Sequence, residues 1–265
     1  MSTGSTVAAK RFRTGAGLLV AGLLLAGCSA EPQAEQMPQD DIHVSATANP
    51  KPSGKPLPSP EPGSSEQTGQ ASTVELATQV GAVFAAQLGF DQSQRIGQEQ
   101  LKELATPPTD TLKDVVVLPS QCEQPLEALN WSPAQLGTEV ARTDFTNQAG
   151  NIAGSVEVAK VADRAPVEEH FKTVLTMRTD CSSVKLNRSE YTETLKFSNP
   201  QVGEVESQLA YTRRGNADTA QDTLVLVQTK GQYVAMVSFI SGQSLADEQF
   251  GQVAKQIMDS VLGQL

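Results

Sequence analysis

Side chains that build catalytic and metal sites are scarce in this chain. Among 265 residues there are two histidines and three cysteines, and aromatic residues make up only 5%. The sequence contains no H-E-x-x-H, C-x-x-C or EF-hand spacing, and neither of the common glycine-rich phosphate-binding motifs. These absences exclude the usual zinc, calcium and nucleotide motifs, so the sequence predicts no metal and no cofactor.

The shortage of histidine also limits catalysis. A serine–histidine–aspartate triad would need His170, because His43 lies in a proline-rich segment that cannot position it. For His170 itself, the pattern favours a solvated histidine on a helix. Ser182 and Lys185 form an S-x-x-K, but this motif leads into an expected strand, and no G-x-S-x-G is present. We therefore expect no enzymatic activity; an envelope hydrolase that uses His170 is the alternative.

A membrane-spanning run is missing as well. Basic residues at Lys10, Arg11 and Arg13 precede an apolar stretch from Gly15 to Leu25 that carries no charge. At ~1.5 Å rise per residue, a helix of this stretch falls well short of the ~30 Å hydrocarbon core of a bilayer. The arrangement is typical of a secretory signal, which is removed after export.

The end of this signal predicts a lipid anchor. Residues Leu25 to Cys28 match the lipobox of bacterial lipoproteins, in which small residues precede a cysteine whose thiol takes a diacylglycerol. Residues 1–27 are then a lipoprotein signal peptide, and the mature chain begins at Cys28 with two or three acyl chains such as palmitate, enough for stable anchoring. The alternative is an ordinary secretory signal, with Cys28 as a passenger or a disulfide partner.

Large apolar side chains are nearly absent from the segment that follows. Eight prolines lie between Pro32 and Pro62, among serine, glycine, glutamine and threonine. This composition cannot bury a core, so residues 28–70 are expected to be a disordered, lipid-anchored tether. Regularly spaced apolar residues return in residues 71–265, a length that suits one domain with its own core.

The three cysteines leave one pair once lipid is attached to Cys28. Cys122 and Cys181 would then be an even pair in an oxidising compartment, which predicts a disulfide. The bridge would close a loop of about 60 residues, and in the chain-entropy model it would raise the free energy of unfolding by ~4 kcal/mol. The alternative is two buried free thiols.

Basic residues are also in the minority. Lysine and arginine number 20 against 30 aspartates and glutamates, a formal net charge of −10. Such a field repels nucleic acid and anionic headgroups, so no nucleic-acid partner is expected. The simplest meaning of this acidity is solubility.

Helical periodicity appears at both ends of the domain. Ser72 and Glu75 are spaced as a capping box, and the apolar face of the helix after them is predicted to comprise Leu76, Val80, Val83, Phe84 and Leu88. A short helix is expected over residues 94–104. Another helix begins near Pro166, with its apolar face on Val167, Phe171, Val174 and Leu175. A closing helix opens at Ser244 and Asp247.

Between these helices the pattern alternates as in strands. Strands are expected at 139–146, 153–162, 184–187, 190–197, 205–213, 222–229 and 232–240, the last two as a central hairpin with its turn at Gly231. Consecutive strands bracketed by helices predict an α+β fold. We expect a single domain after the tether, built as an antiparallel sheet with helices packed mainly on one face.

This order resembles a known family. The runs LKELATPPTDTLKDVVVLPSQC and APVEEHFKTVLTMRTDC, followed by a meander, a hairpin and a closing helix, resemble the extracellular sensor domain of the mycobacterial kinase PknH, which also occurs on actinobacterial lipoproteins. The resemblance covers about residues 95–265. It implies a ligand-sensing role in a cleft beside the sheet and no enzymatic activity, and it places Cys122 and Cys181 at one family disulfide. Two features depart from the family: Arg178 stands where a tryptophan is frequent, and the cysteines of a second disulfide are missing.

The few aromatic residues indicate candidates for a binding surface. Trp131 and Tyr211 each combine an apolar body with a polar tip, and Arg213 beside Tyr211 could meet an acidic ligand. Core packing for Tyr191 and Tyr233, and a plain surface position for Arg213 with its neighbour Arg214, are the alternatives.

Together these patterns predict a lipoprotein on the extracytoplasmic face of the cell membrane, attached through its N-terminal lipid. Its non-catalytic, sensor-like domain is expected to bind a small molecule or an envelope component. The alternative is a structural or adaptor lipoprotein that binds an envelope protein through a flat apolar patch.

Overall fold

The computed structural model describes residues 71–215, 220–245 and 247–265. The predicted signal peptide at 1–27, the lipid-bearing Cys28 and the tether at 28–70 lie outside these residues, so they stay predictions, as does the domain boundary at residue 71. None of the helices in the described ranges combines the length and the apolar character that a membrane span requires.

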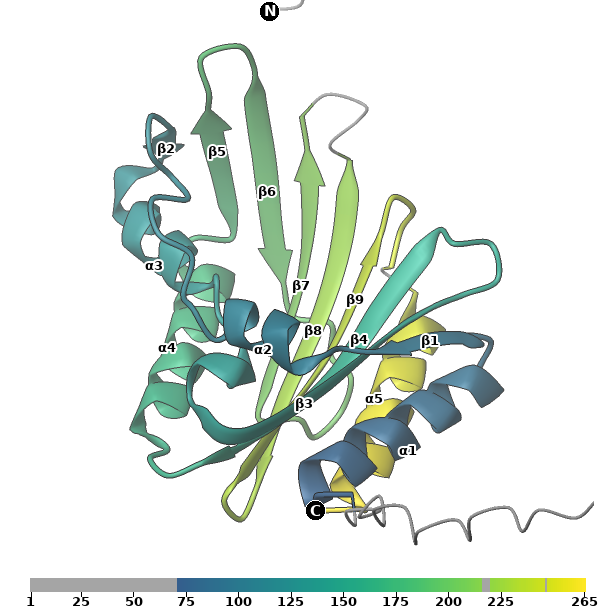
Figure 1. Ribbon diagram of the computed structural model, residues 1–265. Coiled ribbons are helices and arrows are strands. Elements are labelled where there is room, and N and C mark those ends of the chain that lie inside the picture. The colour runs from purple at the N-terminus through teal and green to yellow at the C-terminus, as the bar shows by residue number, and fades with distance from the viewer. Residues whose placement is uncertain (1–70, 216–219, 246) are drawn as a thin grey trace, which may run out of the picture. The chain divides into compact units, whose positions relative to one another are not determined.

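The described residues build one antiparallel sheet of nine strands in the order β1-β3-β4-β9-β8-β7-β6-β5-β2 (Figure 1). The strands are β1 (Gln92–Arg95), β2 (Val116–Leu118), β3 (Gly137–Thr146), β4 (Ile152–Val161), β5 (Ser183–Asn187), β6 (Thr192–Ser198), β7 (Ser207–Arg214), β8 (Gln221–Lys230) and β9 (Tyr233–Ser241). The hairpin of β8 and β9 turns at Gly231, whose φ is 60°, and it occupies the middle of the sheet. The predicted central hairpin is therefore confirmed.

Five α-helices and two 3-10 turns accompany the sheet in the described ranges. They are α1 (Thr73–Gln87), α2 (Gln98–Leu104), α3 (Glu123–Ala128), α4 (Ala165–Thr179) and α5 (Glu248–Leu262), with η1 (Ser120–Cys122) and η2 (Pro133–Gln135). The predicted capping box is present at α1: Glu75 N donates to Ser72 Oγ, and Ser72 N donates to Glu75 Oε2 at 3.0 Å. This backbone hydrogen bond is the main cause that lowers the pKa of Glu75.

Helices α1 and α5 lie side by side over one face of the sheet (Figure 1). Alternate strand positions share a face, so Val156, Leu224 and Val237 are buried together under these helices. Gly81 permits the close approach of α1, because a Cβ at this position would lie 2.6 Å from Cγ2 of Val261 on α5. The larger core of the domain therefore lies between this helix pair and the sheet.

The opposite face carries α3, α4 and η2. Val184, Leu195 and Leu209 point to this side from β5, β6 and β7, where they pack with Val174 and Met177 of α4. The α+β class and the single antiparallel sheet are thus confirmed, but helices cover both faces instead of mainly one. The central strands are apolar on both sides, so each face needs a cover.

The apolar face predicted for α1 is wrong in part. Leu76 and Val83 are 44% and 62% exposed, whereas Val74, Ala77 and Gly81 face the core. Small side chains let the helix lie close to α5 and the sheet, which large apolar residues at these positions would prevent. The buried face of α1 is therefore built mainly from small residues.

The apolar face predicted for α4 is also rotated. Leu175 is 53% exposed, and the core positions belong to Val167, His170, Val174 and Met177. A stripe with spacing three and four runs through these four residues, and His170 was not recognised as part of it because it is polar. The expectation of a solvated His170 is therefore wrong.

Two strands and one α-helix were not predicted. The edge strands β1 and β2 are short, and every residue of β1 is exposed, so no apolar alternation marks it. The helix expected at 94–104 begins only at Gln98, since Gln92–Arg95 pair with β3 as β1. Helix α3 has no buried residue and thus no periodic signal.

Candidate functional site

A cavity of about 370 Å³ lies on the second face of the sheet. Its floor is formed by alternate residues of β6, β7, β8 and β9, and its cover by α3, the segment after α3 and one side of α4. Pockets for small molecules commonly measure ~300–1,000 Å³. The cavity is therefore large enough to bind a small organic molecule.

Most of the lining is apolar. The apolar side chains other than Trp131 and Tyr211 are Leu112, Leu126, Leu129, Val174, Leu186, Leu195, Phe197, Leu209, Val225, Val227, Met236 and Ile240. Apolar surface that lines an open cavity favours an apolar ligand, because binding removes both surfaces from water.

One part of the wall is a stacked pair of rings. The indole of Trp131 lies on the imidazole of His170, with ring centroids 4.2 Å apart and planes 17° from parallel. Trp131 Nε1 and His170 Nδ1 are buried, and neither has a hydrogen-bond partner among the described residues. Unpaired buried polar atoms are rare in folded proteins, so their presence in this wall marks a place that is not optimised for stability alone.

Burial makes His170 a neutral residue. Its side chain loses most of its hydration, which lowers its pKa from 6.5 to about 4. At neutral pH the imidazole therefore adds no charge to the cavity.

The charge in the cavity comes from two arginines. Arg188 and Arg213 both line it, and they share the carboxylate of Glu193, which is 1% exposed. Arg213 donates from Nε and Nη2 to Glu193 Oε2 at 3.1 and 2.9 Å, and Arg188 Nε donates to the same oxygen at 3.4 Å. A plain surface position for Arg213 is therefore wrong: its guanidinium is half-buried and paired.

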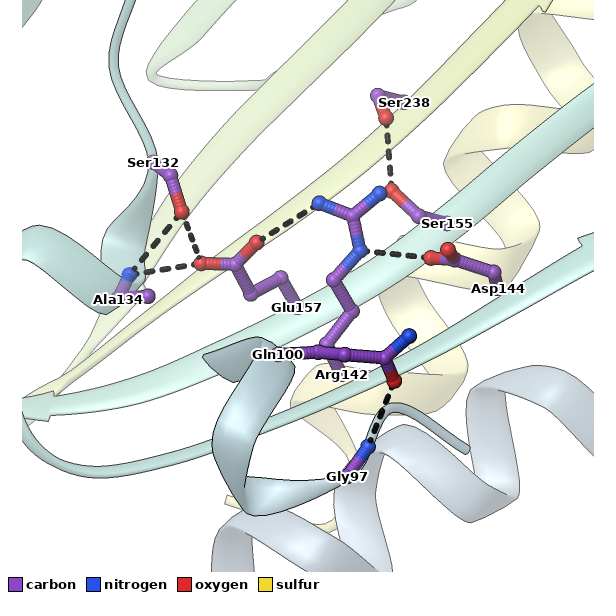
Figure 2. Close-up of polar contacts among 9 residues, drawn as sticks. All are labelled: Gly97, Gln100, Ser132, Ala134, Arg142, Asp144, Ser155, Glu157 and Ser238. Atoms are coloured by element: carbon purple, nitrogen blue, oxygen red, sulfur yellow. Dashed lines mark hydrogen bonds and ion pairs between the residues drawn. The ribbon is translucent and has the colours of Figure 1, made fainter. Parts of the chain in front are cut away.

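A second buried carboxylate fixes the cover of the cavity. Glu157 on β4 is 0% exposed, and its Oε1 accepts hydrogen bonds from Ser132 Oγ and, at 2.7 Å, from Ala134 N (Figure 2). Figure 2 also shows Arg142 between Glu157 and Asp144, with Nε donating to Asp144 Oδ1 at 2.6 Å. Because Ser132 directly follows Trp131, this network holds the indole-bearing segment on the sheet.

The disulfide ties together the other parts of the cover. Cys122 and Cys181 are bonded, with their Cα atoms 5.7 Å apart and both side chains buried. Cys122 precedes α3, and Cys181 follows α4. The predicted disulfide is confirmed, and the alternative of two free thiols is wrong.

The structure brings the three predicted ligand-binding residues together. Trp131, Tyr211 and Arg213 all line the cavity, although they come from the segment after α3 and from β7. That they bind a ligand stays a prediction. Sequence analysis missed Arg188 and Glu193 at the same site; a basic residue beside a β-hairpin turn gives no signal of its own.

Neither the triad with His170 nor the S-x-x-K arrangement considered from the sequence is assembled in the described ranges. His170 makes no hydrogen bond to a serine or a carboxylate there, and no three side chains of the histidine, cysteine, aspartate and glutamate types are placed to hold a metal. Ser182 precedes β5 and Lys185 lies within it, so the S-x-x-K motif is extended instead of helical. Its helical geometry for catalysis is thus missing.

Comparison with known proteins finds structural likeness only. No family model matches the chain, and no match is found among curated proteins. Among solved structures, the extracellular domain of PknH from Mycobacterium tuberculosis matches with 13% identity and a TM-score of 0.37, covering 63% of this chain and 97% of that one. A putative uncharacterised protein from Mycobacterium smegmatis matches with 13% identity and a TM-score of 0.45, covering 70% and 96%. The first is the domain that the sequence resembles, and at these scores neither match says anything about a ligand.

Proposed function

We propose that this protein is a non-catalytic binding protein, whose cavity takes up a small molecule on the extracytoplasmic side of a membrane. The observation that carries the proposal is the cavity of about 370 Å³, which combines apolar walls with a few polar groups at fixed places. The lipobox at Cys28 and the proline-rich segment after it support a lipid-anchored domain held away from the membrane surface.

The binding function is tested by native mass spectrometry. Residues 29–265 are exported behind an ordinary cleavable signal, so that no lipid is attached, and an organic extract of the same sample is analysed. A stoichiometric extra mass that the extract identifies as a small molecule is the expected result. A bare protein mass, with an extract that holds no small molecule above that of an unrelated exported protein, contradicts the proposal.

The anchor is tested separately by detergent phase partition of the full chain. We expect the protein in the detergent phase, and its Cys28→Ser variant in the aqueous phase. Recovery of the unmodified protein from the aqueous phase contradicts the lipid anchor.

An adaptor that binds an envelope protein is the second candidate. It is favoured by the outward-facing side chains of Leu76 and Val83 on α1, which are 44% and 62% exposed. Pull-downs from native envelopes with the Val83→Asp variant as control distinguish the two functions. A partner that the wild type retains and the variant loses supports the adaptor.

A further inference from the structure

The charges at one end of the cavity do not cancel. Glu193 supplies one negative charge, and Arg188 and Arg213 supply two positive charges around a single oxygen of its carboxylate. Among the described residues that line the cavity there is no aspartate, glutamate or lysine, and His170 is neutral above pH ~5. This end of the cavity therefore carries an excess of one positive charge, in a chain whose formal net charge is −10.

Part of the hydrogen-bonding capacity of both arginines is unused. Arg213 Nη1 and both terminal nitrogens of Arg188 have no acceptor among the described residues. The side chain of Arg213 is only 33% exposed and that of Arg188 only 28%, so both are partly withdrawn from water. A guanidinium in such a position binds carboxylate or phosphate oxygens strongly, because charge-assisted pairs gain strength away from water.

The arginines lie at one end of a long floor that is mainly apolar. Along β7, the cavity is lined by Ser207, Leu209, Tyr211 and Arg213, which are alternate residues on one face. Six residues of strand span about 20 Å at ~3.3 Å per residue. The positive charge is thus placed at one end of an elongated floor that is mainly apolar and has Ser207 at the other end of β7. Trp131, His170 and Val174 form part of the wall opposite this floor.

We infer that the ligand of this cavity is an elongated amphiphile with an apolar body and one terminal anionic group, held by Arg188 and Arg213. The inference rests on the proposed binding function and names the class of its ligand. A carboxylate, as in a fatty acid, and a phosphate monoester, as in a phosphorylated lipid, share the required chemistry. The acidic residues elsewhere in the chain do not prevent such binding, because salt screens distant exposed charges. The nearby excess of positive charge therefore dominates the attraction of an anion in the cavity.

The test uses decanoate, decyl phosphate and decanol, which share one apolar chain and differ in the head group. Trp131 is the only tryptophan of the chain and lines the cavity, so its fluorescence reports binding at this site. We expect at least one of the two anions to bind residues 29–265 about tenfold or more tightly than decanol. The anion that binds more tightly, decanoate or decyl phosphate, identifies whether the natural ligand carries a carboxylate or a phosphate.

Charge-neutral variants assign the effect to the arginines. Arg213→Gln and Arg188→Gln should each weaken binding of that anion by roughly ten- to a hundred-fold and leave decanol unchanged. Glu193→Gln should act in the opposite direction and tighten anion binding several-fold, because both guanidiniums lose their competing carboxylate. Arg164→Gln is the matched control, because it removes the same charge from a surface pair with Glu206 outside the cavity. This variant should change neither the affinity for the anion nor the affinity for decanol.

Failure of the inference differs from failure of the binding function. If decanol binds as tightly as both anions, or if the two arginine variants retain wild-type anion affinity, the ligand class is wrong while the cavity remains a binding site. If none of the three compounds changes the Trp131 fluorescence, the inference is overturned, and native mass spectrometry alone then decides on the binding function.

Discussion

The indole of Trp131 stacks on the imidazole of His170, with the ring centroids 4.2 Å apart, and this contact connects the segment after α3 with α4 in the cavity cover. One residue later, Ser132 donates a hydrogen bond to the buried Glu157 on β4. The segment after α3 is thus held on one side by the sheet and on the other by α4. Trp131 is therefore a fixed part of the wall, although its position between two short helical elements gives it no regular secondary structure.

The buried imidazole predicts a pH-dependent stability. Burial lowers the pKa of His170 from 6.5 to about 4, so between these values the unfolded chain binds a proton that the folded protein does not. Above pH 6.5 this residue does not change the free energy of unfolding. As the pH falls toward 4, the free energy of unfolding decreases by up to about 3 kcal/mol, at 1.36 kcal/mol per pH unit. Urea unfolding between pH 7 and pH 4.5 measures this loss.

His170→Gln is the control for this titration. The variant keeps a polar side chain of similar reach but cannot bind the proton, so its free energy of unfolding should fall less over the same pH range. Parallel pH profiles of wild type and variant would contradict the buried neutral imidazole.

The network around Glu157 predicts a large effect from one carboxylate. Replacing Glu157 by alanine leaves Arg142 with one carboxylate fewer, and it removes the acceptor of Ser132 Oγ and the nearer of the two acceptors of Ala134 N. We expect Glu157→Ala to lower the free energy of unfolding by about 3 kcal/mol or more, and Glu157→Gln by less, since its amide oxygen still accepts. Urea denaturation measures both values.

Glu139 on the neighbouring strand β3 is the matched control. It pairs with Lys160 at the surface, where an ion pair adds little. Glu139→Gln should unfold like the wild type. A loss for Glu157→Ala no larger than that for Glu139→Gln would show that the buried network does not hold the cover.

The regular parts of this fold were accessible from sequence because their signals are local. The capping box at Ser72 and Glu75 spans four residues, and the central hairpin is marked by alternation around Gly231. Each of these signals is complete within a few residues of the chain. The type of each helix and strand was accordingly predicted better than the residues that form its buried face.

The polar residues of the site were less accessible because their burial depends on partners distant in sequence. Glu193 is buried through Arg213, 20 residues later, and Glu157 through Ser132, 25 residues earlier. No periodic pattern encodes such a pair. Trp131, Tyr211 and Arg213 could be chosen by residue chemistry alone, but their meeting in one cavity required the topology of the sheet.

The helix face of α1 gives a direct test of packing. A methyl group at Gly81 would lie 2.6 Å from Val261 Cγ2 and 3.1 Å from Val156 Cγ2, so α1 or its neighbours must shift. We expect Gly81→Ala to destabilise by about 1–3 kcal/mol, despite the ~1 kcal/mol that alanine gains in helix propensity. Thermal unfolding measures the change in melting temperature.

Val83→Ala on the same helix is the control, since Val83 is 62% exposed. Its stability should stay within about 0.5 kcal/mol of the wild type. If Val83→Ala destabilised more than Gly81→Ala, the face that the periodicity predicted would be the buried one after all.

The disulfide offers a test that connects stability with the cavity. Cys122 and Cys181 are 59 residues apart in sequence, so their bond removes much of the freedom of the unfolded chain. Replacing both by serine should lower the free energy of unfolding by about 2–5 kcal/mol. Urea denaturation of the double variant, with the wild type under oxidising conditions as control, measures the loss.

The same variant separates two roles of the bond. If it only restrains the unfolded chain, the double variant, studied well below its unfolding transition, binds the decyl compounds like the wild type. If it also positions α3 against α4, both of which cover the cavity, affinity falls while the protein is still folded by circular dichroism. We expect the second result, because α3 has no fully buried residue of its own and the bond lies directly before it. Unchanged affinity in the folded double variant would contradict it.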